Sequence, residues 1–189
     1  MFNPNARVVR YEDPFPHIVI EDAFDEKKLD AVKESLLKES FELQNSDLFT
    51  FLQCDIEKSK NKIINSFCSY LHSQGFIARV AEVMRTKLHS IDISAFIYEK
   101  THHLLPHDDR LKTRKVAYVI NLSSLQEEDG GALALYATQG KKPTVVAKRI
   151  SPHYNTLVLF VVTPQTFHEV EEIVSDTQRI TVTGWFHDQ

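Results

Sequence analysis

The sequence has 189 residues, of which 42% are hydrophobic and 25% charged, and its formal net charge at pH 7 is −4. Such a length and composition are typical of one globular domain with a sizeable core, and the acidic balance argues against a surface that coats nucleic acid. The two cysteines, Cys54 and Cys68, are too few for a disulfide scaffold or a cysteine-based zinc site.

No segment of the sequence has the pattern of a targeting or membrane signal. Residues 1–13 carry charges but no apolar stretch, which predicts no signal peptide. The longest apolar run, 157–162, is far too short to span a bilayer. We therefore expect a soluble protein in a reducing compartment, with a cytoplasmic location (or a nuclear one in a eukaryote) and no membrane partner.

The first half of the chain is expected to be mostly helical. Asp25 can cap a helix, and apolar side chains then recur at helical spacing in three segments. Segment 41–53 is aromatic and mixed, and it favours no element. The predicted elements are a strand over 17–20 and helices over 26–39, 56–70 and 76–88.

From Ile91 onward the apolar pattern changes from helical spacing to alternation, which is typical of strands. Connections rich in Gly, Pro and Asn separate these strands and are too short for crossover helices. The fold class is therefore mainly β with flanking helices, a jelly roll (double-stranded β-helix) over 91–187 supported by a helical layer from 1–90, within a single domain of residues 1–189. The predicted strands are 91–99, 116–122, 132–136, 144–150, 156–162 and 178–186.

Two histidines and one aspartate in this region suggest a metal site. In an extended segment, residues two apart point to the same side, so His107 and Asp109 can bind one object. His168, expected on a strand at the far side of the barrel mouth, would complete a facial triad, which holds iron(II) and leaves positions open. The alternative is a surface pair of His107 and Asp109 with His168 in a turn, because about one His-x-acid triplet is expected by chance.

The last predicted strand has two chemically different faces. Arg179, Thr181 and two further residues share one face, and apolar residues occupy the other. An arginine fork with a hydroxyl two residues later suits a dicarboxylate, since the guanidinium can bind one carboxylate with two hydrogen bonds. The alternative is an edge strand whose polar face meets solvent.

Together, His107-x-Asp109, His168 and Arg179-x-Thr181 resemble the 2-oxoglutarate- and iron(II)-dependent dioxygenase superfamily. Within it the chain resembles the prolyl 3-hydroxylases of a small-subunit ribosomal protein, a family of fungi and animals. The resemblance covers most of residues 10–187. The matching stretches are 45–53, 104–109, 130–136, 164–170 and 179–187.

The resemblance implies a role for each site residue. His107, Asp109 and His168 would bind Fe(II), and Arg179 with Thr181 would bind the distal carboxylate of 2-oxoglutarate. The remaining reactant would be O2, and L-ascorbate is a further candidate cofactor.

Two other positions concern the co-substrate. Tyr98 matches a tyrosine that contacts 2-oxoglutarate, whereas Asn121 stands where the family commonly has a second such tyrosine, so the pocket is expected to differ there. The proteins of that family also carry a second, non-catalytic β-helix domain, and this sequence ends at Gln189, close to the end of the catalytic domain.

The expected function is therefore hydroxylation of a prolyl residue in a protein or peptide, with a small-subunit ribosomal protein as the candidate substrate and no direct nucleic-acid binding. Acidic segments 126–129 and 169–172 are expected to line the route of a basic substrate. The alternatives are the same chemistry on a free amino acid, another small molecule or an alkylated nucleobase, and a non-catalytic jelly-roll module that holds zinc or no metal.

Overall fold

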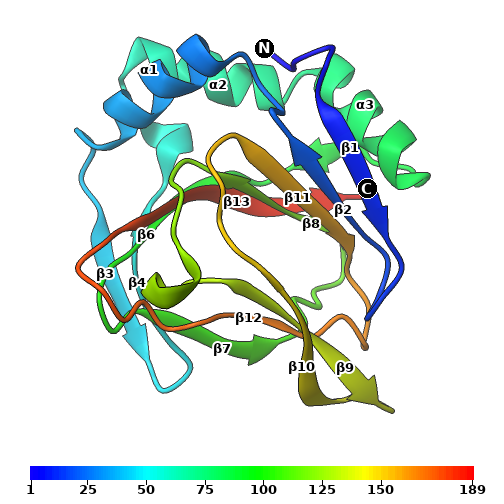
Figure 1. Cartoon of the computed structure of the whole chain (residues 1–189). Coiled ribbons are helices and arrows are strands. Elements are labelled where there is room, and N and C mark those ends of the chain that lie inside the picture. Colours follow the sequence, from blue (N-terminus) through cyan, green and yellow to red (C-terminus); the bar gives the residue numbers. More distant parts are fainter.

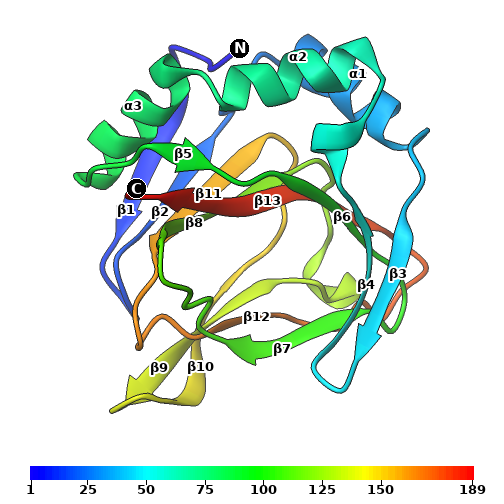
Figure 2. The same ribbon diagram turned by 180° about the vertical axis from the view of Figure 1, so that it is seen from behind.

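Thirteen strands of the computed structural model, which describes residues 1–189, form one curled antiparallel sheet. The sheet folds over on itself to give two layers, and the helices lie along the outside of one of them (Figures 1 and 2). In order across the helix-covered layer the strands are β1 (Arg7–Tyr11), β2 (His17–Glu21), β11 (Thr156–Val161), β8 (Arg114–Asn121), β13 (Arg179–His187) and β6 (Ser94–Tyr98).

The sheet continues through β4 into the second layer. Two short strands complete the sheet, since β3 (Glu42–Ser46) pairs with β4 and β5 (Ser90–Ile91) pairs with β13. The strands that continue the order are β4 (Phe49–Cys54), β7 (His103–His107), β12 (His168–Val170), β9 (Leu133–Gln139) and β10 (Lys142–Ile150).

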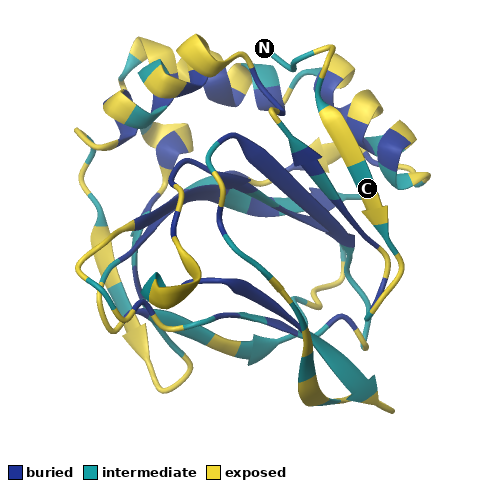
Figure 3. Ribbon diagram, viewed as in Figure 1, coloured by how far each residue is buried: buried dark blue, intermediate teal, exposed yellow.

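Three helices cover the outer face of the first layer: α1 (Glu26–Leu36), α2 (Lys62–Leu71) and α3 (Gln74–Met84). Each begins at a capping side chain, because Asp25, Asn61 and Ser73 accept hydrogen bonds from main-chain N–H groups of the first turn. Figure 3 shows the buried faces of the helices turned toward the sheet and the exposed faces turned outward. The main hydrophobic core therefore lies between the helices and this layer.

Strand β13 separates the core from the interior of the curled sheet. Ile180, Val182 and Phe186 belong to the main core. Arg179 and Thr181 point to the opposite side, where they line a cavity. The alternation predicted for this strand is confirmed, and its polar face meets neither solvent nor the helices.

The predicted fold class, a jelly roll with a layer of N-terminal helices, is confirmed. The first 90 residues, however, also supply β1 to β4, so they are less helical than expected. Segment 41–53, which favoured no element, forms the β3–β4 hairpin. Its residues are mixed because one face of β4 contacts the cavity while β3 lies exposed at the margin of the sheet.

Several boundaries also differ from the predictions. The helix predicted over 56–70 begins only at Lys62, because Asn61 caps it, and a separate 3₁₀ turn occupies Ile56–Lys58. His107 was expected in an extended segment or at a strand end and His168 on a strand, but the bounds of β7 and β12 were not predicted, since neither shows a sustained alternation. None of the helices combines the length and the apolar character needed to cross a bilayer.

Candidate active site

A cavity of about 290 Å³ lies between the two layers of the curled sheet. Apolar and aromatic side chains, such as Phe51, Phe96 and Val170, form much of its wall. Two groups of polar side chains also face it, one built from histidines and a carboxylate and the other around an arginine. Such a largely apolar pocket with a few convergent polar groups is typical of a small-molecule site.

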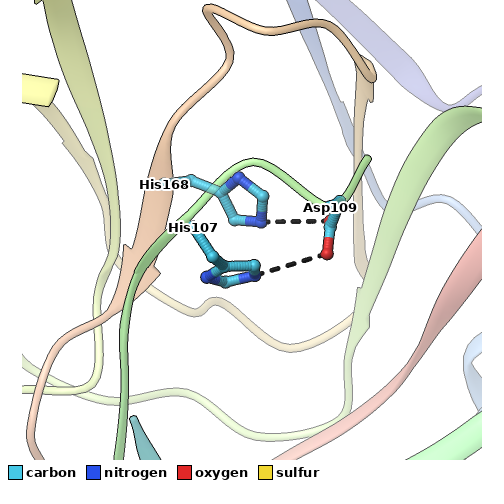
Figure 4. Close-up of side chains that lie close together, drawn as sticks. All are labelled: His107, Asp109 and His168. Atoms are coloured by element: carbon cyan, nitrogen blue, oxygen red, sulfur yellow. Dashed lines mark ion pairs between the residues drawn. The ribbon is translucent and has the colours of Figure 1, made fainter. Parts of the chain in front are cut away.

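The first polar group consists of His107, Asp109 and His168 (Figure 4). His107 is the last residue of β7, His168 is the first residue of β12, and the two are direct partners in the antiparallel pairing. His107 Nε2 lies 3.4 Å from Asp109 Oδ1, and His168 Nε2 lies 3.2 Å from Asp109 Oδ2. One potential ligand atom from each residue lies within 4.8 Å of the others, so the three could hold one metal ion.

The main chain orients both imidazole rings. His107 Nδ1 lies 2.9 Å from the carbonyl oxygen of Leu105, and His168 Nδ1 lies 3.0 Å from that of Thr166. Because a carbonyl oxygen can only accept, each Nδ1 carries the proton and donates it. The Nε2 atoms are therefore left as the ligand atoms, and a hydrogen bond on the other nitrogen is the usual way in which a metal-binding histidine is held.

The geometry of this cluster differs from the prediction in two respects, although its three members do come together. Strand β7 ends at His107, and Asp109 has a left-handed backbone with φ of +59°, so the carboxylate does not reach its place along an extended strand. His168 is not on the far side of a barrel mouth, because β12 is the immediate neighbour of β7.

His107 and Asp109 shift each other's pKa values. Burial opposes ionisation of Asp109, but when His107 and His168 also carry a proton on Nε2, their hydrogen bonds and positive charge outweigh burial, so the pKa of the carboxyl is held well below its usual range. Burial likewise opposes protonation of His107, yet the bond to Asp109 leaves the pKa of this imidazole raised. The carboxylate therefore remains ionised, as a metal ligand must be.

The second polar group is centred on Arg179, the first residue of β13. Its side chain is almost completely buried, with 3% of the residue exposed, yet it forms no ion pair and its Nε has no hydrogen-bond partner. Burial lowers the pKa of the guanidinium below its usual value, and the nearby Tyr98 offsets only part of this shift. A buried cation without a counter-ion is costly, so this site is suited to an anionic ligand.

Tyr98 lies beside this arginine. The two are Cα partners in the β13–β6 pairing, and the guanidinium carbon of Arg179 is 5.3 Å from the centroid of the Tyr98 ring. Burial raises the pKa of Tyr98 to about 12, although the arginine charge opposes this, so the phenol stays protonated and able to donate.

Thr181 and Asn121 are direct partners in the β13–β8 pairing. Thr181 lines the cavity beside Arg179, whereas Asn121 is buried but is not part of the cavity wall. Asn121 Nδ2 donates to Thr156 Oγ1 at 2.8 Å, and its Oδ1 has no partner. The expected site residues thus all lie in one region, with Asn121 behind the others.

The cavity wall also contains residues that sequence reasoning missed. Arg114 at the start of β8 places its guanidinium carbon 3.2 Å from the centroid of the Trp185 ring, and both residues face the cavity. Trp185 could have been inferred, because it shares a face of β13 with Arg179, but no sequence pattern points to Arg114.

The acidic segments 126–129 and 169–172, which were expected to line the route of a basic substrate, contribute no carboxylate to the cavity wall. Of residues 126–129 and 169–172, only Val170 forms part of the wall. Glu169, Glu171 and Glu172 instead line a separate surface groove with His103 and Leu105 of β7. These carboxylates are therefore not part of the cavity wall, and their place along a substrate route stays a prediction.

Comparison with known proteins identifies the family. Residues 93–187, which contain all the side chains described above as facing the cavity from β6, β7, β8, β12 and β13, match the family model described as "2OG-Fe(II) oxygenase superfamily". The chain belongs to this superfamily. Iron(II) and 2-oxoglutarate (2OG) are its cofactor and co-substrate.

The curated relatives of the chain are larger proteins. It is 34% identical to prolyl 3-hydroxylase OGFOD1 of Xenopus laevis, a match that covers 92% of this chain and 35% of the relative. Prolyl 3,4-dihydroxylase OGFOD1 of Ostreococcus tauri is 33% identical over 93% of this chain and 38% of the relative. The chain thus spans little more than a third of the length of these relatives.

Solved structures share the fold. A prolyl-4-hydroxylase of Pseudomonas putida superimposes with a TM-score of 0.75 at 17% identity, covering 92% of each chain. A prolyl hydroxylase of Trichoplax adhaerens, determined with a peptide fragment of hypoxia inducible factor, gives a TM-score of 0.71 at 17% identity over 91% of this chain and 83% of that one. At this identity the likeness concerns the fold.

Proposed function

We propose that the protein is an Fe(II)- and 2OG-dependent prolyl hydroxylase whose substrate is a proline in a protein or peptide. The observation that carries this proposal is the meeting, in one cavity, of a two-histidine, one-carboxylate cluster and a buried arginine without a counter-ion. The relatives that are prolyl hydroxylases by name support the choice of substrate class.

In this proposal His107, Asp109 and His168 hold the metal. Their donor set fits iron(II), which two neutral imidazole nitrogens and one ionised carboxylate would hold while further ligand positions stay available. Iron(II) bound there would supply the oxidative chemistry of the superfamily, in which 2OG and O2 are converted to succinate and CO2 while a C–H bond becomes C–OH.

Arg179 and its neighbours would bind the co-substrate. The guanidinium would pair with the distal carboxylate of 2OG through two parallel hydrogen bonds, and Thr181 would add a third. Tyr98, a neutral phenol, would donate to the same ligand. The pairing of Arg179 with a carboxylate would also supply the counter-ion that this buried side chain lacks.

The protein substrate that we propose is a small-subunit ribosomal protein, read as a short flexible loop around one proline. The net charge of −4 suits a basic partner, because complementary charge raises the encounter rate. The groove lined by Glu169, Glu171 and Glu172 is separate from the cavity, so any contribution from these carboxylates would be to docking. A reducing, cytoplasmic location accords with the two free thiols, Cys54 and Cys68.

The test is turnover of a synthetic peptide that carries the proline loop of the ribosomal protein. The protein is incubated with Fe(II), 2OG, O2 and L-ascorbate, and succinate formation is compared with a 16 Da mass gain on proline. We expect both products from the wild type, with a rate that falls as salt is added, and neither product from His168→Ala.

The other possible outcomes separate the alternatives. Turnover of free proline without turnover of the peptide would assign the protein to small-molecule chemistry. Absence of succinate with every substrate, in a protein that binds Fe(II) and 2OG, would instead favour a binding module.

A further inference from the structure

The main chain at Asp109 lacks the support that holds the other two members of the cluster. His107 and His168 lie within strands whose ladders fix the backbone, whereas Asp109 lies in the connection between β7 and β8. Its φ of +59° is in the left-handed region, which costs an L-residue roughly 1–2 kcal/mol. Neither the N–H nor the carbonyl of Asp109 forms a hydrogen bond with another main-chain group.

One side chain forms a hydrogen bond with the main chain of Asp109. Arg114 Nη1 donates to the carbonyl oxygen of Asp109 at 3.3 Å, and this is the only hydrogen bond that either the Asp109 carbonyl or the Arg114 side chain forms. The partner is the main chain rather than the carboxylate, so the arginine leaves the carboxylate oxygens free to face the two histidines.

The position of the guanidinium is itself fixed. Arg114 is the first residue of β8, opposite His187 of β13, and its guanidinium lies over the indole of Trp185 with 3.2 Å from its carbon to the ring centroid. Arg114 is half-buried and forms no ion pair, so its side chain is committed to Trp185 and to the carbonyl of Asp109. Contact with the aromatic face restricts the movement of the guanidinium and keeps its fork near Asp109.

We propose that Arg114 is a positioning residue that fixes the metal-binding carboxylate of Asp109 through the main-chain carbonyl, with Trp185 as its support. This inference rests on the proposed function in one respect, namely that Asp109 is a metal ligand. The face of β13 that carries Arg179 therefore also fixes, through Trp185 and Arg114, the direction in which the Asp109 carboxylate points.

The experiment measures metal binding in the absence of substrate and 2OG. Metal-free protein is titrated with Co(II), whose visible absorption bands report both the affinity and the arrangement of ligands. We expect Arg114→Lys and Arg114→Met to weaken Co(II) binding about 10- to 100-fold, as is usual when a group that orients a ligand is removed. We also expect altered bands in both variants, because the carboxylate is no longer held in one orientation.

The matched control is Arg110→Gln. Arg110 belongs to the same connection and also forms a hydrogen bond within it, but its Nε donates to Asp108 Oδ2 at 2.8 Å rather than to Asp109. The Co(II) affinity and the visible absorption bands of Arg110→Gln should equal those of the wild type. Trp185→Phe, which keeps an aromatic face under the guanidinium, should lose less affinity than Trp185→Leu.

Each result has a definite meaning. If the wild type binds Co(II) and Arg114→Lys binds it with the same affinity and spectrum, the positioning role is overturned while the proposed metal site stands, even if the lysine variant melts at a lower temperature. If the wild type itself binds no Co(II), the proposed function fails first. Should Arg114→Met not fold, Arg114→Lys decides, since it keeps the charge and most of the apolar stem.

Discussion

His107 and His168 are direct partners across the β7–β12 pairing, and the centroids of their rings lie 4.2 Å apart. The distance between these two candidate ligands is therefore set by a main-chain ladder, which varies little. Asp109, which lies outside the ladder, is the member of the cluster whose placement depends on other side chains.

Replacing His168 with alanine should abolish tight binding of Fe(II) and the formation of succinate. The cluster would keep only one imidazole and one carboxylate, too few to hold the ion against water. The fold should remain, because the substitution removes one side chain at the start of a short strand. Metal content and circular dichroism check the two halves of this prediction. His103→Ala, on the neighbouring strand and outside the cavity, is the control and should keep its metal.

Arg179→Lys should weaken binding of 2OG far more than binding of Fe(II). Lysine keeps the positive charge but loses the fork, and a charge-assisted hydrogen bond contributes roughly 1.5–3 kcal/mol, or about 10- to 150-fold in affinity. Calorimetric titration of 2OG into metal-loaded protein measures the loss. Arg149→Lys, which alters an exposed pair with Glu171, provides the comparison. Equal 2OG affinity in wild type and Arg179→Lys would mean that Arg179 does not bind the co-substrate.

Gly184→Ala should destabilise the protein by about 1–3 kcal/mol or more. A methyl group at this position of β13 would lie 2.1 Å from the carbonyl oxygen of Asp92, so one of the two main chains would have to move. Gly75→Ala, near the start of α3, meets no atom within 4 Å and should stabilise by up to about 1 kcal/mol. Urea unfolding of both variants gives the sign and size of each effect.

Asn155→Ala should lower the free energy of unfolding by roughly 2–4 kcal/mol. Asn155 Oδ1 accepts from the main-chain N–H of Phe24 at 2.9 Å and Nδ2 donates to its carbonyl at 2.8 Å, so alanine leaves two buried groups without partners. Its φ of +59° adds to the cost, since asparagine tolerates this conformation better than alanine does. Denaturant unfolding checks the prediction, and exposed Asn5→Ala should change stability by less than about 0.5 kcal/mol. A loss of similar size in both variants would contradict it.

The parts of the structure that could be predicted from the sequence are those in which one residue pattern governs one element. The alternation in β13 separated Ile180 and Val182 from Arg179 and Thr181 correctly, because one face of this strand packs in the core. The three helices were also predicted, although capping by Asn61 moved the start of α2.

The remainder depends on tertiary contacts that leave no local pattern. Strand β12 is three residues long, so His168 gave no indication that it would lie directly beside His107. The left-handed backbone of Asp109, and the hydrogen bond that its carbonyl accepts from Arg114, belong to a connection whose residues show no periodic pattern. Spacing along the chain can suggest which residues meet, but it cannot supply the conformation in which they do so.

Because the two faces of β13 differ chemically, correct folding depends on the register in which this strand pairs with its neighbours. A slip of one residue in its pairing would turn Ile180 and Val182 into the cavity and force Arg179 and Thr181 into the main hydrophobic core, whose side chains are apolar. Misaligned molecules would therefore fail to form a stable core and would be open to proteolysis. Protein that survives protease treatment should therefore contain few molecules in which Arg179 lies outside the cavity. Nearly all of the intact protein is then expected to have a correctly assembled site around Arg179.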